Sequence, residues 1–319
     1  MSHSTAELHR PVMLQRCIEL LRPGLQVENP IVIDCTLGLG GHTEALLQEY
    51  PTAMVIGIDR DPKAIELASE RLAKFGERFI PVLAVYDEIA SILDRLRISE
   101  VNGILMDLGV SSMQLDFADR GFSYAQDAVL DMRMDQTQGK TAADLLAQLD
   151  EAELARIFRR YGEERFAGPI ARRIAKERSG TPILTSSQLN KIVVDVVPAV
   201  PGKLAGHPAK RVYQALRIAV NDELGVLEDA VPQAIDALAV GGRLVVMSYH
   251  SLEDGIVKEA LQAAATSSTP VDMPIELPGT APVLKIITRG VERAGEIELE
   301  KNPRSASARL RAAEKLEAK

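Results

Sequence analysis

The stretch from Ile31 to Asp59 constrains the fold of this chain more than any other. A short apolar run rich in β-branched residues leads into a glycine-rich turn, Gly38 to Gly41, then a helical pattern, then a second apolar run that ends in Asp59. Glycines in such a turn let the backbone approach a ligand closely. An acid about 20 residues after the loop suits the hydroxyls of a ribose. The stretch therefore predicts a nucleoside-containing cofactor.

The identity of that cofactor depends on what the glycine loop lacks. A dinucleotide fingerprint needs a third glycine at the position that Thr43 occupies. S-adenosylmethionine has a ribose and an adenine but no phosphate, and its sulfonium cation favours nearby acids such as Asp34 and Asp107. An NAD-dependent oxidoreductase remains open at this point, as does an ordinary tight turn in a cofactor-free α/β domain.

Length and composition narrow the class of protein. The 319 residues allow one large domain or two moderate ones. No apolar run reaches the ~18 residues of a membrane span, and the N-terminus shows no signal-peptide pattern. Cys17 and Cys35 are the only cysteines, which argues against a disulfide framework or a CxxC metal site, and no metal constellation is visible. We expect a cytoplasmic protein.

Charge is unevenly distributed along the chain. The net charge of −8 argues against nonspecific binding of nucleic acid. Yet residues 156–178 carry eight Arg or Lys against three Glu, and residues 203–217 carry four basic residues and no acid. Such patches can be the electrostatic footprint of RNA binding, or simply solvated helix faces.

The first third of the chain alternates between strand and helix patterns. We expect strands at 31–33, 54–58, 79–86 and 101–106, and helices at 11–21 (with Pro11 in its first position), 43–50, from 61 and 89–96. This order implies a parallel sheet with right-handed crossovers. Ligands bind such sheets at the carboxyl ends of the strands, where Asp34, Asp59, Asp87 and Asp107 fall.

The pattern changes after Asp107. Residues 141 to about 197 are helical in pattern, and Thr185 with Gln188 fits a capping box. Strand patterns return at 243–248 and 283–288, residues 263–282 are typical of a loop, and the chain from Glu296 is ambiguous. The sequence predicts a discontinuous α/β domain, 1–111 and 211–319, interrupted by a helical insert at 112–210.

Several motifs, taken together, resemble one family. They are Asp34–His42 (DCTLGLGGH), Asp59–Pro62 (DRDP), Asp107–Ser112 (DLGVSS) with Gln114–Asp116 (QLD), Arg120–Ser123 (RGFS), Leu130–Asp135 (LDMRMD), Tyr161–Glu164 (YGEE), Gln214–Ile218 (QALRI) with Val220–Asn221, His250–Asp254 (HSLED) and Asn302–Arg304 (NPR). They look like the RsmH family, also called MraW, which are bacterial methyltransferases of small-subunit ribosomal RNA. The match runs nearly end to end and includes motifs outside the generic methyltransferase core.

The resemblance implies a fold and a reaction. The fold is a Rossmann-like, S-adenosylmethionine-dependent methyltransferase domain with an inserted helical domain, which would recognise the substrate. The reaction is methyl transfer to the N4 exocyclic amine of cytidine 1402 in the decoding centre of 16S rRNA, within the small ribosomal subunit. A methyltransferase with another nucleic-acid acceptor and an inactive ribosome-assembly protein are the alternatives. Whether the protein is a monomer or a homodimer is open.

The resemblance also implies which residues contact the cofactor. They are Gly40, Gly41, His42, Asp59, Tyr86, Asp107 and Gln114. The loop backbone would approach the methionine part, Asp59 would accept from both ribose hydroxyls, and Tyr86 would pack on adenine. For His42, the alternative is a residue at a helix N-terminus that points to solvent.

The chemistry suggests roles for a few residues more. A cytosine amine is a poor nucleophile, so it needs positioning and an acceptor for its N–H. Asp107 is the hypothetical acceptor, and the alternative is that it only binds cofactor. His250, Ser251 and Asp254 are hypothetical contacts of a cytosine flipped out of its stack.

Four positions depart from the family pattern. Met113 replaces a usual Pro, and Tyr249 replaces a usual Phe. Gly255 and Ala306 each replace an Arg, which removes positive charge where RNA contacts could lie.

Overall fold

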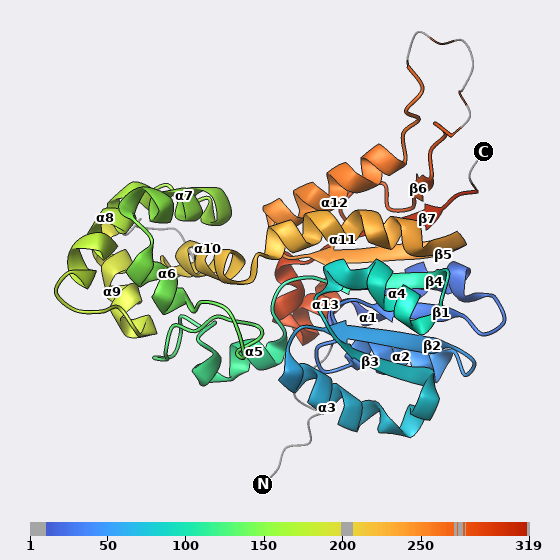
Figure 1. The fold of residues 1–319 in the computed structure, drawn as a ribbon, viewed down its shortest axis with the longest axis horizontal. Coiled ribbons are helices and arrows are strands. Elements are labelled where there is room, and N and C mark those ends of the chain that lie inside the picture. Colours follow the sequence, from blue (N-terminus) through green and yellow to red (C-terminus); the bar gives the residue numbers. More distant parts are fainter. Residues whose placement is uncertain (1–10, 199–206, 271–272, 274–276, 278, 318–319) are drawn as a thin grey trace. The chain divides into compact units, whose positions relative to one another are not determined.

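Two compact units make up the chain, which is shown as a computed structural model in Figure 1. The structure describes residues 11–198, 207–270, 273, 277 and 279–317. The first unit combines Met1–Gly109 with Leu224–Lys319, and the second is Val110–Glu223. Among the described residues, no helix has both the length and the apolar character that crossing a membrane requires.

A seven-stranded sheet forms the centre of the first unit. Its order is β3-β2-β1-β4-β5-β7-β6. The strands are β1 (Ile31–Asp34), β2 (Met54–Asp59), β3 (Phe79–Leu83), β4 (Val101–Asp107), β5 (Leu238–Ser248), β6 (Leu284–Ile286) and β7 (Arg309–Lys315). The first five are parallel, and β7 runs antiparallel between β5 and β6. Strand order reverses between β1 and β4, so the carboxyl ends there form the crevice in which doubly wound sheets bind ligands.

Helices cover both faces of this sheet (Figure 1). The covering helices are α1 (Leu14–Leu21), α2 (Gly41–Glu49), α3 (Pro62–Leu72), α4 (Ile89–Leu96), α11 (Glu223–Ala237) and α12 (Ser251–Ala264). The unit also contains the short helix α13 (Glu296–Lys301) and the 3-10 turns η1 (Arg22–Leu25), η2 (Ala73–Arg78), η3 (Tyr86–Glu88) and η5 (Pro303–Ser307). Alternate strand residues point to opposite faces. Accordingly Ile33 and Ile104 join the apolar layer under α4, α11 and α12, whereas Val32 and Leu105 join the layer under α1, α2 and α3.

Expected and observed elements agree well in the first third of the chain. The four predicted parallel strands are present, and Asp61 caps α3 by accepting from the backbone N–H of Lys63, with Pro62 first in the helix. The prediction of Pro11 as a first helical residue is wrong. Helix α1 begins at Leu14, after Met13 in the left-handed conformation with φ 48°.

The ambiguous C-terminal segment contains β7, a strand that the sequence did not predict. Charged residues interrupt its apolar pattern, as in RLRAAEK. The strand forms because Leu310, Ala312 and Ala313 are fully buried once it lies between two other strands. Its neighbours in the sheet, not its own periodicity, select the extended conformation.

The second unit is built from helices around one apolar core. They are α5 (Ser112–Asp116), η4 (Ala118–Arg120), α6 (Ala142–Gln148), α7 (Glu151–Gly162), α8 (Ala167–Arg178), α9 (Ser186–Val196) and α10 (Lys210–Asn221). Capping boxes begin four of them, at Ser111, Thr141, Asp150 and the predicted Thr185. Helix α10 lies in this unit, not in the α/β unit, because Val212 and Leu216 are buried in its core. The observed limits, 110–223, thus extend past the expected 112–210.

Candidate active site at the carboxyl ends of the parallel strands

The glycine loop between β1 and α2 adopts a backbone that other residues would strain. Gly38 and Gly40 have φ of 50° and 74°, and Gly40 caps α2 in the left-handed conformation. A Cβ on Gly40 would lie 2.9 Å from Cδ1 of Leu72, and a Cβ on Gly41 would collide with Pro11. The loop is therefore restricted to glycine both by conformation and by close packing.

Backbone and side-chain hydrogen bonds connect this loop to the ends of two other strands. The Leu37 N–H donates to the Ile58 carbonyl of β2 at 2.9 Å. On the other side, the Asp107 N–H at the end of β4 donates to Oγ1 of Thr36 at 2.7 Å. The ends of β1, β2 and β4 are thus held together as one rim.

Asp59 lies at the end of β2, beside the loop. Its Oδ2 accepts from the Gly38 N–H at 2.8 Å, and its Oδ1 accepts from the Asp61 N–H at 2.9 Å. Burial raises the pKa of Asp59 to about 6, although these two hydrogen bonds oppose the rise. A carboxylate has about four lone-pair sites, so this one retains the capacity to accept from a pair of hydroxyls.

Asp34 has a structural task within the rim. Its side chain is buried, and it accepts from the Thr43 hydroxyl at 2.7 Å and from the Thr36 N–H at 3.3 Å. Burial raises the pKa of Asp34 above its usual value. The residue ties the end of β1 to the first turn of α2, and it adds an acid to the same site.

Asp107 ends β4 and has a perturbed pKa. The Tyr249 hydroxyl donates to its Oδ1 at 2.6 Å, and Nδ1 of His42 lies 4.0 Å from its Oδ2. Burial raises the pKa of Asp107 to about 7, against the hydrogen bond from Tyr249, which lowers it. The pKa of this carboxyl group therefore lies near neutrality, the range that suits a general base.

His42 is buried in the first turn of α2, so the alternative of a solvent-pointing residue is wrong. Its Nε2 lies 3.1 Å from the carbonyl oxygen of Val12. Because a carbonyl only accepts, Nε2 carries the proton and the Nδ1 lone pair faces Asp107. Burial lowers the pKa of His42, which favours this neutral form.

Two further predicted cofactor contacts lie elsewhere along the chain. Tyr86 begins η3, three residues beyond the end of β3, and is partly buried. Gln114 belongs to the helical unit, where its side chain and that of Ser111 form the capping box of α5. Their roles toward a cofactor remain predictions.

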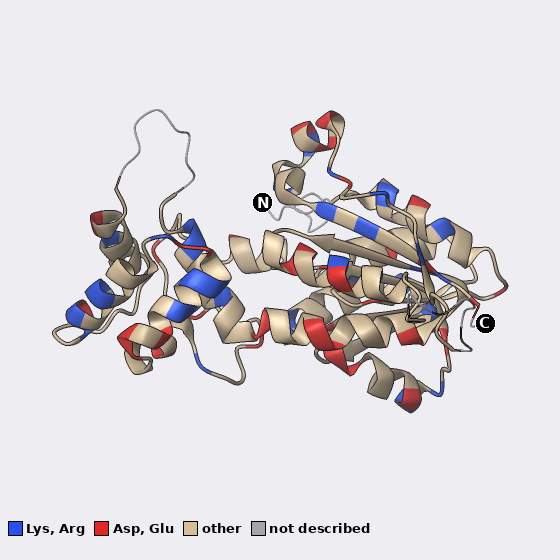
Figure 2. Ribbon diagram, turned by 90° about the horizontal axis from the view of Figure 1, so that it is seen from above, with Lys and Arg blue, Asp and Glu red and all other residues tan. Residues whose placement is uncertain are grey.

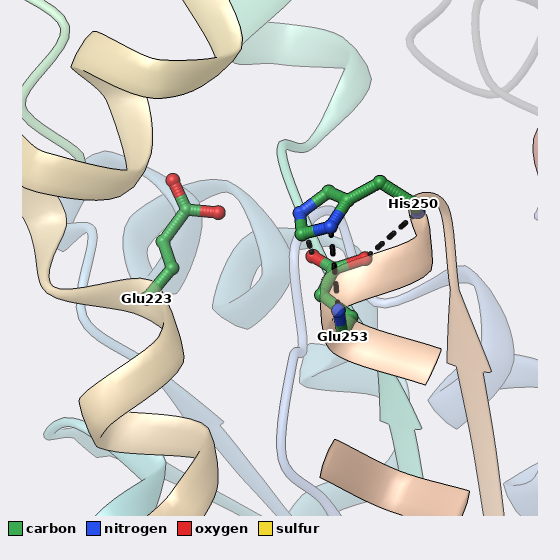
Figure 3. A group of neighbouring side chains, drawn as sticks. All are labelled: Glu223, His250 and Glu253. Carbon is green, nitrogen blue, oxygen red and sulfur yellow. Dashed lines mark hydrogen bonds and ion pairs between the residues drawn. The ribbon is translucent and has the colours of Figure 1, made fainter. Parts of the chain in front are cut away.

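His250 and Glu253 begin helix α12 as a reciprocal cap, which Figure 3 shows in close-up. The Glu253 N–H donates to Nδ1 of His250 at 3.3 Å, and Oε2 of Glu253 accepts from the Tyr249 N–H at 2.8 Å. Nε2 of His250 lies 3.1 Å from Oε1 of Glu253. The imidazole is thus engaged with its own helix, whereas Ser251 in the first turn is exposed. Their predicted contacts with a cytosine remain predictions.

Asp254, the third hypothetical substrate contact, has a partner on β7. Its Oδ1 and Oδ2 accept from Nε and Nη2 of Arg311 at 2.7 and 3.1 Å, and Nη1 of Arg309 lies 3.6 Å from Oδ2. This bidentate ion pair accounts for the burial of the carboxylate. The role of Asp254 in substrate binding remains a prediction.

Sequence reasoning did not assign three residues that build this site. Thr36 accepts from the N–H of Asp107, Glu253 anchors the backbone at Tyr249, and Tyr249 donates to Asp107. One signal was present in the sequence, because Tyr249 directly follows the strand predicted at 243–248.

Fold and site together define a class of protein. A Rossmann-like sheet carries a glycine loop at β1, an acid that can accept from a ribose diol at β2 and a carboxyl group with a pKa near neutrality at β4. These are features of an enzyme that binds a nucleoside-containing cofactor. The model of the MraW methylase family matches residues 6–316, and the chain belongs to this family.

Relatives resemble the chain over nearly its whole length. The Ribosomal RNA small subunit methyltransferase H of Beutenbergia cavernae is 57% identical over 311 residues, which are 98% of this chain and 93% of the relative. The protein of the same name from Pseudarthrobacter chlorophenolicus is 56% identical over 320 residues, 99% and 97% of the two chains. A putative methyltransferase structure from Streptococcus mutans, in complex with SAH, is 12% identical, covers 99% of this chain and 100% of that one, and has a TM-score of 0.40.

S-adenosylmethionine is the cofactor of this methylase family, and the site fits it. The glycine loop leaves no room for a Cβ at Gly40. The contact of Asp59 with a ribose remains a prediction. Burial raises the pKa values of both Asp34 and Asp107. The positive charge of a sulfonium would favour the ionised form of these carboxyl groups.

Proposed function

We propose that this chain transfers a methyl group from S-adenosylmethionine to the N4 amine of cytidine 1402 in 16S rRNA of the small ribosomal subunit. The observation that carries the proposal is the likeness, at 57% identity over nearly the whole chain, to a ribosomal RNA small subunit methyltransferase. The choice of the amine and of the cytidine rests on the resemblance of the sequence motifs to the RsmH family. A ribosomal RNA substrate implies that the reaction takes place in the cytoplasm.

The chemistry needs a proton acceptor, and Asp107 supports that role. When bound, the cofactor supplies an electrophilic methyl group: a new N–C bond forms, the S–C bond breaks with its electron pair going to sulfur, and the amine must lose a proton. Oδ1 of Asp107 already accepts from Tyr249, whereas Oδ2 is turned toward His42 without hydrogen-bonding to it at 4.0 Å. Oδ2 is therefore the oxygen that would accept the proton of the amine.

Other residues of the rim would hold and orient the cofactor. The backbone of Gly40 and Gly41 would approach its methionine part, and Asp59 would accept from the ribose hydroxyls. Tyr86 would pack on the adenine, a contact worth about 1 kcal/mol beyond area burial. Gln114 would contribute from the helical unit.

The helical unit would recognise the RNA. Figure 2 shows that Lys and Arg are spread over its helices. Within residues 156–178, the exposed basic side chains are Arg156, Arg159, Arg160, Arg165, Arg172 and Lys176. Each phosphate that such a side chain neutralises releases a counterion, which makes binding dependent on salt. Arg178 is excluded from this set, because it donates to the carbonyls of Leu146 and Leu149.

Methyl transfer to small ribosomal subunits that lack the modification tests the proposal. The protein is incubated with labelled S-adenosylmethionine, and nucleoside mass spectrometry identifies the product. We expect N4-methylcytidine from the wild type and a loss of roughly 100-fold or more in kcat from Asp107→Asn, the usual contribution of a general base. Asp94→Asn, on the exposed face of α4, is the matched control and should retain full activity.

Binding of the cofactor must be measured beside activity. If Asp107→Asn binds S-adenosylmethionine within about tenfold of the wild-type affinity but transfers no methyl group, the carboxylate acts in catalysis. If cofactor binding is lost instead, Asp107 is a binding residue. A wild type that binds the cofactor but methylates neither subunits nor naked RNA would overturn the proposal that RNA is the substrate. The alternatives would then be methylation of DNA and a role in ribosome assembly without methyl transfer.

A further inference from the structure

A tyrosine from the next strand meets the carboxylate at the end of β4. Parallel pairing sets Asp107 opposite Met247 of β5, so Tyr249 comes just after the end of that strand. Its hydroxyl donates to Oδ1 of Asp107 at 2.6 Å across 142 positions of sequence. Its own backbone is fixed, because its N–H donates to Oε2 of Glu253 at 2.8 Å.

The phenol can only act as a donor here. Burial and the neighbouring carboxylate raise the pKa of Tyr249 well above its usual value, so its proton stays on the oxygen. A hydrogen bond to the charged form of a carboxyl group favours that form. The donation from Tyr249 therefore keeps Asp107 ionised to a lower pH than burial alone would allow.

Other titratable groups surround Asp107 on every element packed against it. They are Asp34 at the end of β1, His42 on α2, Glu253 on α12 and Cys17 on α1. Two are acids and oppose a negative charge on Asp107, and His42 faces it with a lone pair. In the part of the chain that the structure describes, the side-chain hydrogen bond that favours the ionised form of Asp107 comes from Tyr249.

We propose that Tyr249 is a positioning residue for methyl transfer: its hydroxyl fixes Oδ1 of Asp107, so that Oδ2 is held toward the amine whose proton it accepts. The inference rests on the proposed function. It concerns a single atom, because Phe at this position would keep the ring and lose only the hydroxyl that donates to Asp107. The oxygen tunes the pH range of the reaction, since Asp107 itself accepts the proton.

The pH dependence of kcat in Tyr249→Phe tests the proposal. Loss of a hydrogen bond to a charged group should move the acid limb of the profile up by about one pH unit. At the pH of the wild-type midpoint, kcat then falls roughly fivefold, and two pH units above that midpoint it recovers to within about twofold. The KM for S-adenosylmethionine should stay unchanged. Tyr50→Phe, the same change at the far end of α2, should leave the profile unaltered.

A direct titration of the Asp107 carboxyl group by ¹³C NMR completes the test, because it does not require activity. Its midpoint should move with the kinetic limb in Tyr249→Phe and not in Tyr50→Phe. An unshifted limb, a loss of kcat that is equal at all pH values, or a pH effect confined to KM would each overturn the positioning role. A wild type that makes no N4-methylcytidine would instead overturn the proposed function, whatever the titration shows.

Discussion

Replacing Asp59 by Asn should weaken the affinity for the cofactor and raise the stability of the cofactor-free protein. The variant therefore distinguishes the role of this residue in binding from its effect on folding. In the wild type, the carboxylate accepts from the N–H groups of Gly38 and Asp61. Two further bonds from ribose hydroxyls would also be made to a charged group. Such bonds are worth about 1.5–3 kcal/mol each, against about 0.5–1.5 kcal/mol for neutral ones. The variant should therefore bind S-adenosylmethionine about 2–3 kcal/mol more weakly, or roughly 30- to 150-fold.

The stability of the cofactor-free protein should respond differently. Burial raises the pKa of Asp59 from 3.8 to about 6. A carboxyl group whose pKa is raised by folding contributes stability below pH 3.8, and that stability is lost as the pH rises through about 6. The loss is at most about 3 kcal/mol, and solvent at this partly buried side chain reduces it to about 2 kcal/mol. Asn does not titrate, so Asp59→Asn should gain stability relative to wild type between pH 4 and pH 8.

Two measurements check this reasoning. Isothermal titration calorimetry gives the affinity for S-adenosylmethionine, and urea denaturation at pH 4, 6 and 8 gives the free energy of unfolding. Asp94→Asn is the control for a change of charge on an exposed helix. An affinity within threefold of wild type would refute the ribose contact. A stability difference between variant and wild type that does not vary with pH would refute the burial argument.

Two further substitutions test the packing of the site. Gly40→Ala should destabilise the fold by about 2–3 kcal/mol, because a φ of 74° strains any side chain and the new Cβ would lie 2.9 Å from Leu72; denaturation measures this. Arg311→Met should cost about 2–3 kcal/mol, because it leaves the buried Asp254 carboxylate with the more distant Arg309, at 3.6 Å. Affinity for the cofactor should not change in calorimetry.

Each of these substitutions has a matched control in the chain. Gly139→Ala has the same backbone strain, with φ of 79°, but nothing lies within 4 Å of the new Cβ, so it should cost about 1 kcal/mol. Equal costs at the two glycines would contradict the contact with Leu72. Arg172→Met removes an exposed ion pair with Glu151 and should cost less than about 0.5 kcal/mol. If Arg311→Met costs no more stability than Arg172→Met, burial of the Asp254 carboxylate does not strengthen its ion pair.

Much of the fold could be predicted because its signals are local. The four first strands, the glycine loop, the cap at Asp61 and the capping box at Thr185 each depend on residues within one turn or one strand of one another. Strand β7 could not be predicted, because its extended conformation depends on strands that lie before it in the chain. The extent of the helical unit was underestimated for a similar reason, since α10 is assigned by the core it enters.

The features of the site also fall into those set by local sequence and those set by contacts between distant residues. By itself, the sequence determined that the ends of the parallel strands carry acids beside a glycine loop, because strand ends and glycine turns are visible as patterns along the chain. Only the tertiary structure decided which groups meet there. It buries His42, pairs Asp254 with Arg311 across 57 positions and brings the Tyr249 hydroxyl to Asp107 across 142. The pairing of strands and the burial of side chains determine these contacts and the pKa of about 7 at Asp107. Strand pairing and burial depend on residues far apart in the chain, so the local spacing of residues does not reveal them.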